Sequence, residues 1–377
     1  MLVSSYSLVV TILMTSQSLG SLYDPHLFPQ KGPFFEGWYM RIIDYDSNQS
    51  YGLLFGSVLP TDSHNVSGPL VLASILMRRC EQQGGCKLMS VNGEFSPINL
   101  NITARGKQVT KNPDTRSPPD FKWMVNSKNN GGYLEQKGET TTFTFKLGEL
   151  AFRGEATKPV PWNSAGTGPE GWLVYLPLPL HWFVYSLRSE LQIYEIENTT
   201  SGAVVSGSNG VVHLEKNWGN SFPKRWIWSE GVSSATNATI NISGGLVELF
   251  NLFSVDAYLI GIRDPQNSLA LDLRPDNSVV SAKIDGCGGR INMSVNSISY
   301  NVEIEISAKA GTYSNCLLGP EVVGFRPVCV ESYDATATIT VSTRSFIPFL
   351  FNDEKKYTIA NVALEFGGSH VCNDKCS

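Results

Sequence analysis

Short segments rich in β-branched and aromatic residues recur along the whole chain, bounded by glycine, proline, asparagine or aspartate. Many alternate apolar with polar residues, which is the period of a half-buried β-strand. No window keeps helical periodicity over three turns, and 34 glycines and 20 prolines supply turns at strand spacing. These features predict an all-β chain that forms a sandwich or barrels with closed edges. The predicted strands include Tyr51–Leu59, Leu70–Met77, Thr141–Phe145, Leu191–Ile196, Thr239–Ile242, Ala257–Ile262, Val302–Ile306, Ala335–Ser342 and Thr358–Leu364.

The chain is long enough for two domains. With 377 residues, 42% of them hydrophobic, it can bury a sizeable core. Pro33–Tyr39 and Ser221–Ile227 share a phenylalanine and a tryptophan four residues apart, and each opens a block of predicted strands. We therefore expect one barrel over residues 27–205 and a second over residues 211–377, with the Gly/Ser/Asn-rich segment Ser201–Gly210 as the linker region.

Residues 1–20 have the pattern of a secretory signal peptide. They carry no Lys, Arg, Asp or Glu, and the apolar run Leu8–Met14 precedes a small-x-small pattern at Ser18–Gly20. An uncleaved anchor is the alternative, although no stretch reaches the roughly eighteen apolar residues of a membrane span. The formal charge of −5 and the lack of a basic run predict no nucleic-acid partner. We expect a secreted protein, or one in the lumen of the secretory pathway, with its oligomeric state left open.

Entry into the secretory pathway would make N-x-S/T sequons candidate surface glycan sites. The sequons begin at Asn48, Asn65, Asn101, Asn198, Asn237, Asn241 and Asn292.

The cysteine spacing fits an oxidising compartment. Cys80 and Cys86 flank a flexible Gly-containing loop, and Cys316 and Cys329 flank another short excursion. We therefore predict one disulfide within each of these pairs.

Three further cysteines leave an odd thiol. Cys287 is expected to pair with Cys372 or Cys376, and the remaining one stays free or pairs between chains. No C-x-x-C motif with partner histidines occurs and the histidines are scattered, so no metal site is predicted.

The segment Val212–Val232 has the most unusual composition in the chain. It combines three tryptophans with the carboxylate of Glu215, the amide of Asn217, three cations and the chain breakers Gly219 and Pro223. A surface loop rarely contains three indoles, and a buried strand rarely carries so many charges. The composition indicates a partly enclosed polar site framed by aromatic faces. The alternative is an irregular strand entry, with packed aromatic rings and charges paired at the rim.

This segment resembles the E-K-N-W-G-x-x-F-P-x-x-W-x-W signature of the tocopherol cyclase family at Glu215–Gly219, Ser221–Pro223 and Arg225–Trp228. Phe34–Arg41 matches the family's F-F-E-G-W-Y block, and Val362–Gly368 resembles its V-E-I-G-G block.

A fourth element, Pro179–Trp182, lies where the family has P-H-W, with Leu180 inserted. The order of blocks is kept across roughly residues 30 to 370. The chain departs from the family after Gly368, where a cysteine-containing end replaces the usual tail.

The resemblance implies two calycin/lipocalin-like antiparallel β-barrels packed together, as in the related carotenoid 1,2-hydratases and lipocalin-like cycloaddition enzymes. It also implies acid chemistry. A tocopherol cyclase protonates a trisubstituted alkene on a prenylated quinol, and the ring hydroxyl captures the tertiary cation. Such a step needs a protonated carboxylic acid in a dry cavity with aromatic faces near the cation. The sequence contains no G-x-S-x-G elbow, P-loop or dinucleotide fingerprint, so no cofactor is expected.

We predict a cofactor-independent cyclase or isomerase that binds a small apolar prenylquinol, terpenoid or polyene between two barrels. A secreted lipid carrier that keeps the fold without the acid is the alternative. The candidate acids are Glu215, Glu36 and Glu365, which lie in three separate family blocks. The candidate substrate-binding residues are Trp38, Tyr39, His181, Trp182, Lys216, Asn217, Trp218, Trp226 and Trp228.

Structural roles are the alternatives for the first two acids. Glu36 precedes a glycine and could accept backbone N–H bonds at a strand start. Glu215 could pair with Arg225 or Arg41 as an interdomain strut. Lys216 follows Glu215 directly, so in an extended strand their side chains point to opposite faces.

The remaining candidates also have structural alternatives. Glu365 alternates with small residues and is either an inward, perturbed carboxyl group or a charge on a barrel rim. His181 fits a satisfied core histidine as well as a proton shuttle. The tryptophans fit the core as well as a cavity wall.

Overall fold

The computed structural model describes residues 22–27, 31–62, 64, 66–80, 86–104, 107–108, 120–249, 253–344, 351–374 and 376. The predicted signal peptide and the sequon at Asn65 lie outside these residues.

The first half of the chain forms one antiparallel sheet in the order β4-β3-β2-β1-β13-β11-β10-β9-β8-β7-β5-β6, with β12 paired to β11. The sheet curls around an apolar core until β4 at one edge approaches β9, giving a nearly closed barrel. Its strands are β1 (Phe34–Asp44), β2 (Gln49–Leu59), β3 (Val71–Cys80), β4 (Cys86–Phe95), β5 (Leu100–Ala104), β6 (Lys107–Gln108), β7 (Asp120–Asn126), β8 (Gly131–Lys137), β9 (Thr140–Leu147), β10 (Leu150–Val160), β11 (Leu180–Asn198), β12 (Ala203–Gly207) and β13 (Gly210–Gly219).

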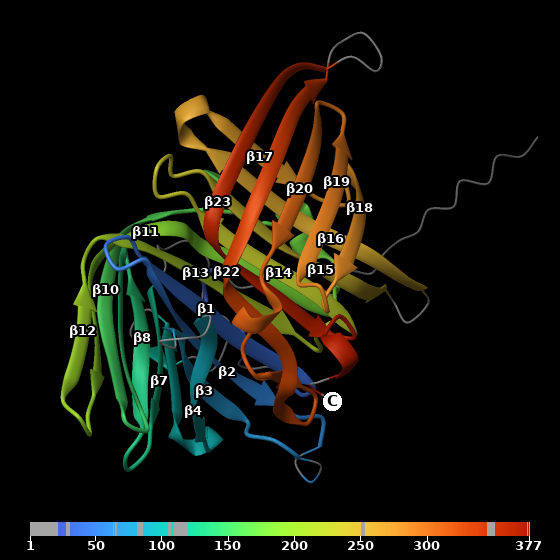
Figure 1. Ribbon diagram of the computed structural model, residues 1–377. Coiled ribbons are helices and arrows are strands. Elements are labelled where there is room, and N and C mark those ends of the chain that lie inside the picture. The colour runs from blue at the N-terminus through green and yellow to red at the C-terminus, as the bar shows by residue number, and fades with distance from the viewer. Residues whose placement is uncertain are drawn as a thin grey trace, which may run out of the picture.

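The second half forms another antiparallel sheet in the order β17-β16-β15-β14-β23-β22-β20-β19-β18, with β21 paired to β22. Figure 1 shows this sheet, in yellow to red, packed against the blue and green strands of the first. Its strands are β14 (Arg225–Val232), β15 (Thr239–Leu249), β16 (Phe253–Asp264), β17 (Leu269–Leu273), β18 (Ser278–Asp285), β19 (Arg290–Ser297), β20 (Tyr300–Ser307), β21 (Leu317–Glu321), β22 (Gly324–Arg344) and β23 (Phe351–Gly368).

The helices among the described residues are all short 3-10 turns: η1 (Pro97–Asn99), η2 (Gly171–Tyr175), η3 (Pro265–Asn267), η4 (Ala310–Thr312) and η5 (Cys372–Asp374). In this part of the chain no helix has the length and apolar character to cross a membrane. The prediction of an all-β, antiparallel fold is confirmed.

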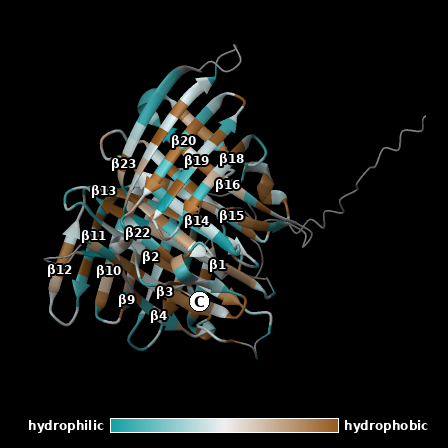
Figure 2. Cartoon of the chain, turned by 45° about the vertical axis from the view of Figure 1, so that its right-hand side comes forward, coloured by the Kyte–Doolittle hydropathy of each residue, from teal (hydrophilic) through white to brown (hydrophobic). Residues whose placement is uncertain are grey.

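Strand alternation places buried apolar residues between the two sheets as well as inside each of them. On β1, Trp38 and Met40 point into the first barrel, whereas Tyr39 points out of it toward the second sheet. Ile227 on β14 packs inside the second sheet, and Trp228 lies on its other face. The alternation is visible as mixed brown and teal along the central strands in Figure 2. The apolar core between the sheets is therefore built from both halves of the chain.

The change from one sheet to the other falls between Gly219 and Arg225. The segment expected to be a linker, Ser201–Gly210, instead contributes the edge strand β12 and the turn into β13. The central signature therefore spans the junction. Its first part lies in β13 of the first sheet and its second part in β14 of the other.

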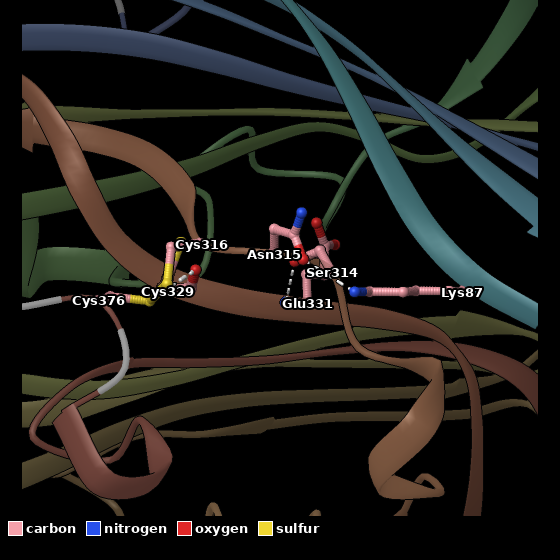
Figure 3. The surroundings of a disulfide bond; sticks show 7 residues. All are labelled: Lys87, Ser314, Asn315, Cys316, Cys329, Glu331 and Cys376. Atoms are coloured by element: carbon pink, nitrogen blue, oxygen red, sulfur yellow. Dashed lines mark hydrogen bonds between the residues drawn. A yellow bond between two sulfur atoms is a disulfide. The ribbon is translucent and has the colours of Figure 1, made fainter.

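Three disulfides are formed: Cys80–Cys86, as predicted, Cys287–Cys372, and Cys316–Cys376. The predicted bond between Cys316 and Cys329 is wrong. In the β21–β22 pairing Cys329 lies opposite Leu317, and neighbouring residues of a strand point to opposite faces. Cys316 consequently bonds Cys376 near the chain end, as Figure 3 shows. The buried Cys329 is the free cysteine of the described residues. Three disulfides fit an oxidising compartment.

One predicted glycan site is incompatible with the fold. Asn241 is 1% exposed, in the middle of β15 between β14 and β16. A glycan there would displace packed strands. Asn48, Asn237 and Asn292 are exposed, and Asn101 and Asn198 are partly exposed.

Candidate active site

A cavity of about 660 Å³ lies where the two sheets face each other. It is lined by strands of the first sheet, by β14, β15, β16 and β23 of the second, and by η2 with the loop that follows it. Most of its wall is apolar, including Leu173, Leu176, Leu178, Leu246, Val247 and Leu259. Its volume lies within the range of small-molecule sites.

The first sheet contributes a row of adjacent side chains to this cavity. Tyr39 on β1 lies opposite Leu54 on β2 and opposite Glu215 on β13. All three line the cavity, because directly opposite residues in an antiparallel sheet share a face. Two residues further along β13, Asn217 lies opposite Trp182 of β11, and both also line the cavity.

The second sheet contributes a matching row. Glu365 on β23 lies between Trp228 on β14 and Glu331 on β22, each directly opposite it in the pairing. Trp228 and Glu365 line the cavity, and Glu331 lies behind them as part of the buried interior. The candidates Tyr39, Trp182, Glu215, Asn217, Trp226, Trp228 and Glu365 are thus brought to one cavity.

Glu365 is held by an indole. The Trp226 Nε1–H donates to its Oε1 at 2.5 Å. Gly367, opposite Trp226, makes this possible, since a Cβ there would lie 1.9 Å from an atom of the ring. Burial raises the pKa of Glu365 to about 7, and the nearby Glu215 also raises it. A carboxyl group with this pKa carries a proton in a substantial fraction of molecules at neutral pH.

Glu331 is a buried carboxyl group that sequence reasoning missed. The Tyr39 hydroxyl donates to its Oε1 at 2.8 Å and lies 2.8 Å from the Tyr333 hydroxyl. Burial raises the pKa of Glu331 well above its usual range, and the neighbouring Glu365 raises it further. The sequence signal was the alternation Cys329-x-Glu331-x-Tyr333, which places a carboxyl group on the same face of a strand as a buried thiol and a phenol.

Glu215 is paired with a histidine rather than with the arginines that the sequence suggested. Its Oε2 lies 2.9 Å from His213 Nε2, on the same face of β13. Burial lowers the pKa of His213, but the bond to Glu215 and the charge of Glu230 outweigh it, so the pKa is raised. This environment favours the protonated form of His213.

The predicted partners of Glu215 bind elsewhere. Arg225 pairs with Asp256 near the surface. Arg41 pairs with Glu230 at 2.8 Å, with both side chains fully buried. Because Arg41 is on β1 and Glu230 on β14, this ion pair is the strut between the sheets.

Glu36 does not line the cavity. Its carboxylate accepts from the backbone N–H groups of His26 and Leu27 at 2.8–2.9 Å and pairs with Lys216 Nζ at 3.2 Å, inside the first barrel. Burial raises the pKa of Glu36, but Lys216 and the His26 bonds outweigh it, so the pKa is lowered. As expected for adjacent strand residues, Lys216 points into the barrel while Glu215 points into the cavity.

The Lys216 ammonium is enclosed by the N-terminal segment. It donates to the Asp24 carbonyl and lies 2.9 Å from His26 Nδ1. Burial lowers the pKa of Lys216 to about 8, and burial together with Lys216 lowers that of His26 to about 4. Lys216 therefore fastens residues 22–27 to the barrel and is not available to a ligand in the cavity.

The other candidates outside the cavity are packing residues. Trp38 belongs to the core of the first barrel. Trp218 stacks between His26 and His181, with ring centroids at 4.6 and 5.2 Å. His181 Nδ1 lies 2.8 Å from Glu170, a cavity-lining carboxylate that the sequence did not single out.

Among the described residues, no group of three or more His, Cys, Asp or Glu is arranged to hold a metal ion. The chain itself places two carboxyl groups, Glu365 with its raised pKa and Glu215, on the walls of an apolar cavity with indole and phenol faces.

A family model described as tocopherol cyclase-like matches residues 32–371, which include both sheets and the cavity. A curated relative, the chloroplastic tocopherol cyclase of Zea mays, is 25% identical over 337 residues, or 80% of this chain and 67% of the relative.

Two solved structures are similar at 11% identity. Kievitone hydratase from Nectria haematococca has a TM-score of 0.49, with 89% of each chain covered. A putative AttH from Nitrosomonas europaea has a TM-score of 0.45, with 92% of this chain and 95% of the other covered.

Proposed function

Because the chain belongs to the tocopherol cyclase-like family, we propose that it is an intramolecular cyclase acting by acid catalysis on a small apolar substrate. The substrate is a prenylated phenol, terpenoid or polyene held in the cavity between the two sheets. The observation that carries this proposal is Glu365, a cavity-lining carboxyl group whose pKa is raised to about 7 by burial and by Glu215.

Glu365 is the proton donor. Its O–H bond breaks, and the proton forms a C–H bond with the less substituted carbon of the substrate alkene, which leaves a tertiary carbocation. The faces of Trp226 and Trp228 stabilise this cation by cation–π attraction. The Glu215 carboxylate, fixed by His213, adds electrostatic stabilisation from the opposite wall.

Ring closure completes the reaction. In a substrate that carries a hydroxyl group, as a prenylated phenol does, the hydroxyl oxygen forms a C–O bond to the cationic carbon, and its proton passes to the Glu365 carboxylate. The acid is regenerated and no atom is gained or lost, so the net reaction is an isomerisation. The apolar wall excludes water, which would otherwise capture the cation.

The substrate enters past η2. Leu173 on η2 and Leu176 just after it line the cavity three residues apart, so they share one face of the turn. Trp172 and Tyr175, on the other face, are 54% and 60% exposed. An entrance of this composition suits an apolar chain whose reactive double bond reaches the glutamates.

The chain is proposed to act in an oxidising compartment, as a secreted or lumenal protein. The three disulfides support this proposal.

Conversion of a panel of prenylated phenols, followed by liquid chromatography and mass spectrometry, tests the function. The wild-type protein should form a ring-closed isomer, and Glu365→Gln should lower kcat by about a hundredfold or more, the lower end for loss of a general acid. Stoichiometric recovery of unchanged ligand, with no isomer from any phenol, would instead identify a lipid carrier.

A further inference from the structure

Glu331 and Glu365 face each other directly on neighbouring antiparallel strands, β22 and β23. Residues opposite each other in this way have Cβ atoms about 4.5–5.5 Å apart, so their carboxyl groups can meet. Glu331 Oε1 accepts from Tyr39, while its Oε2 is buried and has no hydrogen-bond partner among the described residues. Glu365 is the carboxyl group directly across the strand pairing from this unpaired oxygen.

The groups around this pair do not neutralise two negative charges. The Cys329 thiol and the Tyr333 phenol lie on β22, the strand of Glu331, and the phenol of Tyr39 comes from β1. Trp226 of β14 donates one bond to Glu365.

If Glu331 and Glu365 were both ionised, the charged groups around them would not cancel the two negative charges. Glu215 of β13 is a further carboxylate near both members. Arg41 of β1 is the cation near Glu331, but its guanidinium already pairs with Glu230 of β14. His213 of β13 pairs with Glu215. Two buried carboxylates in this setting cannot both ionise at neutral pH.

We propose that Glu331 stays protonated at neutral pH and donates a hydrogen bond from Oε2 to Glu365, acting as the positioning residue for that acid. This inference rests on the proposed function, in which Glu365 is the proton donor. The Glu331 hydroxyl fixes the Glu365 carboxyl group against Trp226. After Glu365 gives up its proton, the same bond stabilises the carboxylate that remains.

Burial and the Glu365 charge raise the pKa of Glu331 well above its usual range, in agreement with this arrangement. Burial raises that of Glu365 only to about 7. The pair should therefore release one proton near neutrality and keep the other at alkaline pH.

Infrared difference spectroscopy of the full chain without substrate tests the pair, because a protonated carboxyl group has its own C=O stretch. About two pH units above the midpoint of Glu365, the wild-type protein should retain one buried protonated carboxyl band that is absent from Glu331→Gln. No such band in the wild type, or a band unchanged in Glu331→Gln, would overturn the proposal.

A second variant keeps the test decisive if Glu331→Gln does not fold. In Glu365→Gln the Glu331 band should persist but titrate at a lower pH than in the wild type, because the opposing charge is gone. An unchanged titration would mean that the two groups are not paired.

Kinetics separates positioning from packing. Glu331→Gln keeps a neutral donor, so its kcat should stay within about threefold of wild type, whereas Glu331→Leu should lose about tenfold or more. Equal kcat in the two variants would refute the positioning role.

The spectra need no turnover, so a confirmed pair without cyclisation would defeat only the proposed function. Glu365-dependent cyclisation without the alkaline band would defeat only this inference.

Discussion

The three glutamates predicted from the sequence lie in different environments. The face of the strand from which each side chain projects, and the strand paired with it, determine its neighbours. The Glu36 carboxylate accepts hydrogen bonds from backbone N–H groups of residues 22–27 and pairs with Lys216. Glu215 has a histidine partner, and Glu365 has an indole and another carboxyl group beside it. The same side-chain chemistry therefore gives a structural anchor, a fixed carboxylate and a proton donor.

Glu36→Gln should act on stability. The substitution leaves the Lys216 ammonium buried without its carboxylate, which costs on the order of 3–5 kcal/mol. Denaturant unfolding should show this loss, while kcat per folded molecule stays near wild type. The matched control is Glu365→Gln, which should reverse the pattern. A stable Glu36→Gln protein with little activity would place Glu36 in the reaction instead.

Activity should depend on pH through Glu365. Burial first, and then Glu215, raise its folded-state pKa from 4.5 to about 7, and the protonated form is the donor. The kcat should be constant well below about pH 7 and fall about tenfold per unit above it. The free energy of unfolding should fall as pH rises from 4.5 to about 7, because in this range the folded protein binds a proton at Glu365 that the unfolded chain has released. A kcat that rises through neutrality would contradict the assignment of Glu365 as acid.

At the scale of elements, the local sequence correctly predicted those features that follow from the alternation of side chains along a strand. It predicted the all-β class and the opposite directions of Glu215 and Lys216. It could not give cross-strand register, which sets Glu331 opposite Glu365, because register depends on strands and turns far apart in the chain. The same limit explains the wrong partner for Cys316: short sequence spacing does not fix the direction of a side chain.

The disulfide arrangement can be checked by non-reducing peptide mapping. Alkylation before denaturation should leave Cys329 unlabelled, because it is buried and its pKa is raised well above the usual range, first by burial. Mapping after denaturation should recover Cys316 linked to Cys376, with Cys80–Cys86 as the internal control. A Cys316–Cys329 peptide would contradict the β21–β22 register.

The whole molecule depends on the core between the sheets. Arg41 spans it, bonding Glu230 and the Asn361 carbonyl of the second sheet and lying 4.6 Å above the Tyr333 ring. From the sequence, a strut between Glu215 and Arg225 or Arg41 was the alternative to a catalytic role for Glu215, but the carboxylate that pairs with Arg41 is Glu230. Glu215 and Glu230 lie on strands of different sheets, and only the docking of those sheets decides which one meets Arg41.

Arg41→Met should test this strut. Removing the guanidinium leaves Glu230 buried and unpaired, and should lower the free energy of unfolding by on the order of 3–5 kcal/mol. Lys158→Met removes an exposed pair with Glu190 and should cost no more than about 1 kcal/mol. Equal effects of the two substitutions would show that the ion pair does not hold the sheets together.

Turnover in D₂O tests the central claim, proton donation from the protein to a substrate carbon, most directly. The Glu365 carboxyl group exchanges with solvent, so a cyclised product should carry a single non-exchangeable deuterium, on the carbon next to the new C–O bond. Mass spectrometry and deuterium NMR would locate it. A ring-closed product without deuterium at that carbon would contradict acid catalysis by Glu365.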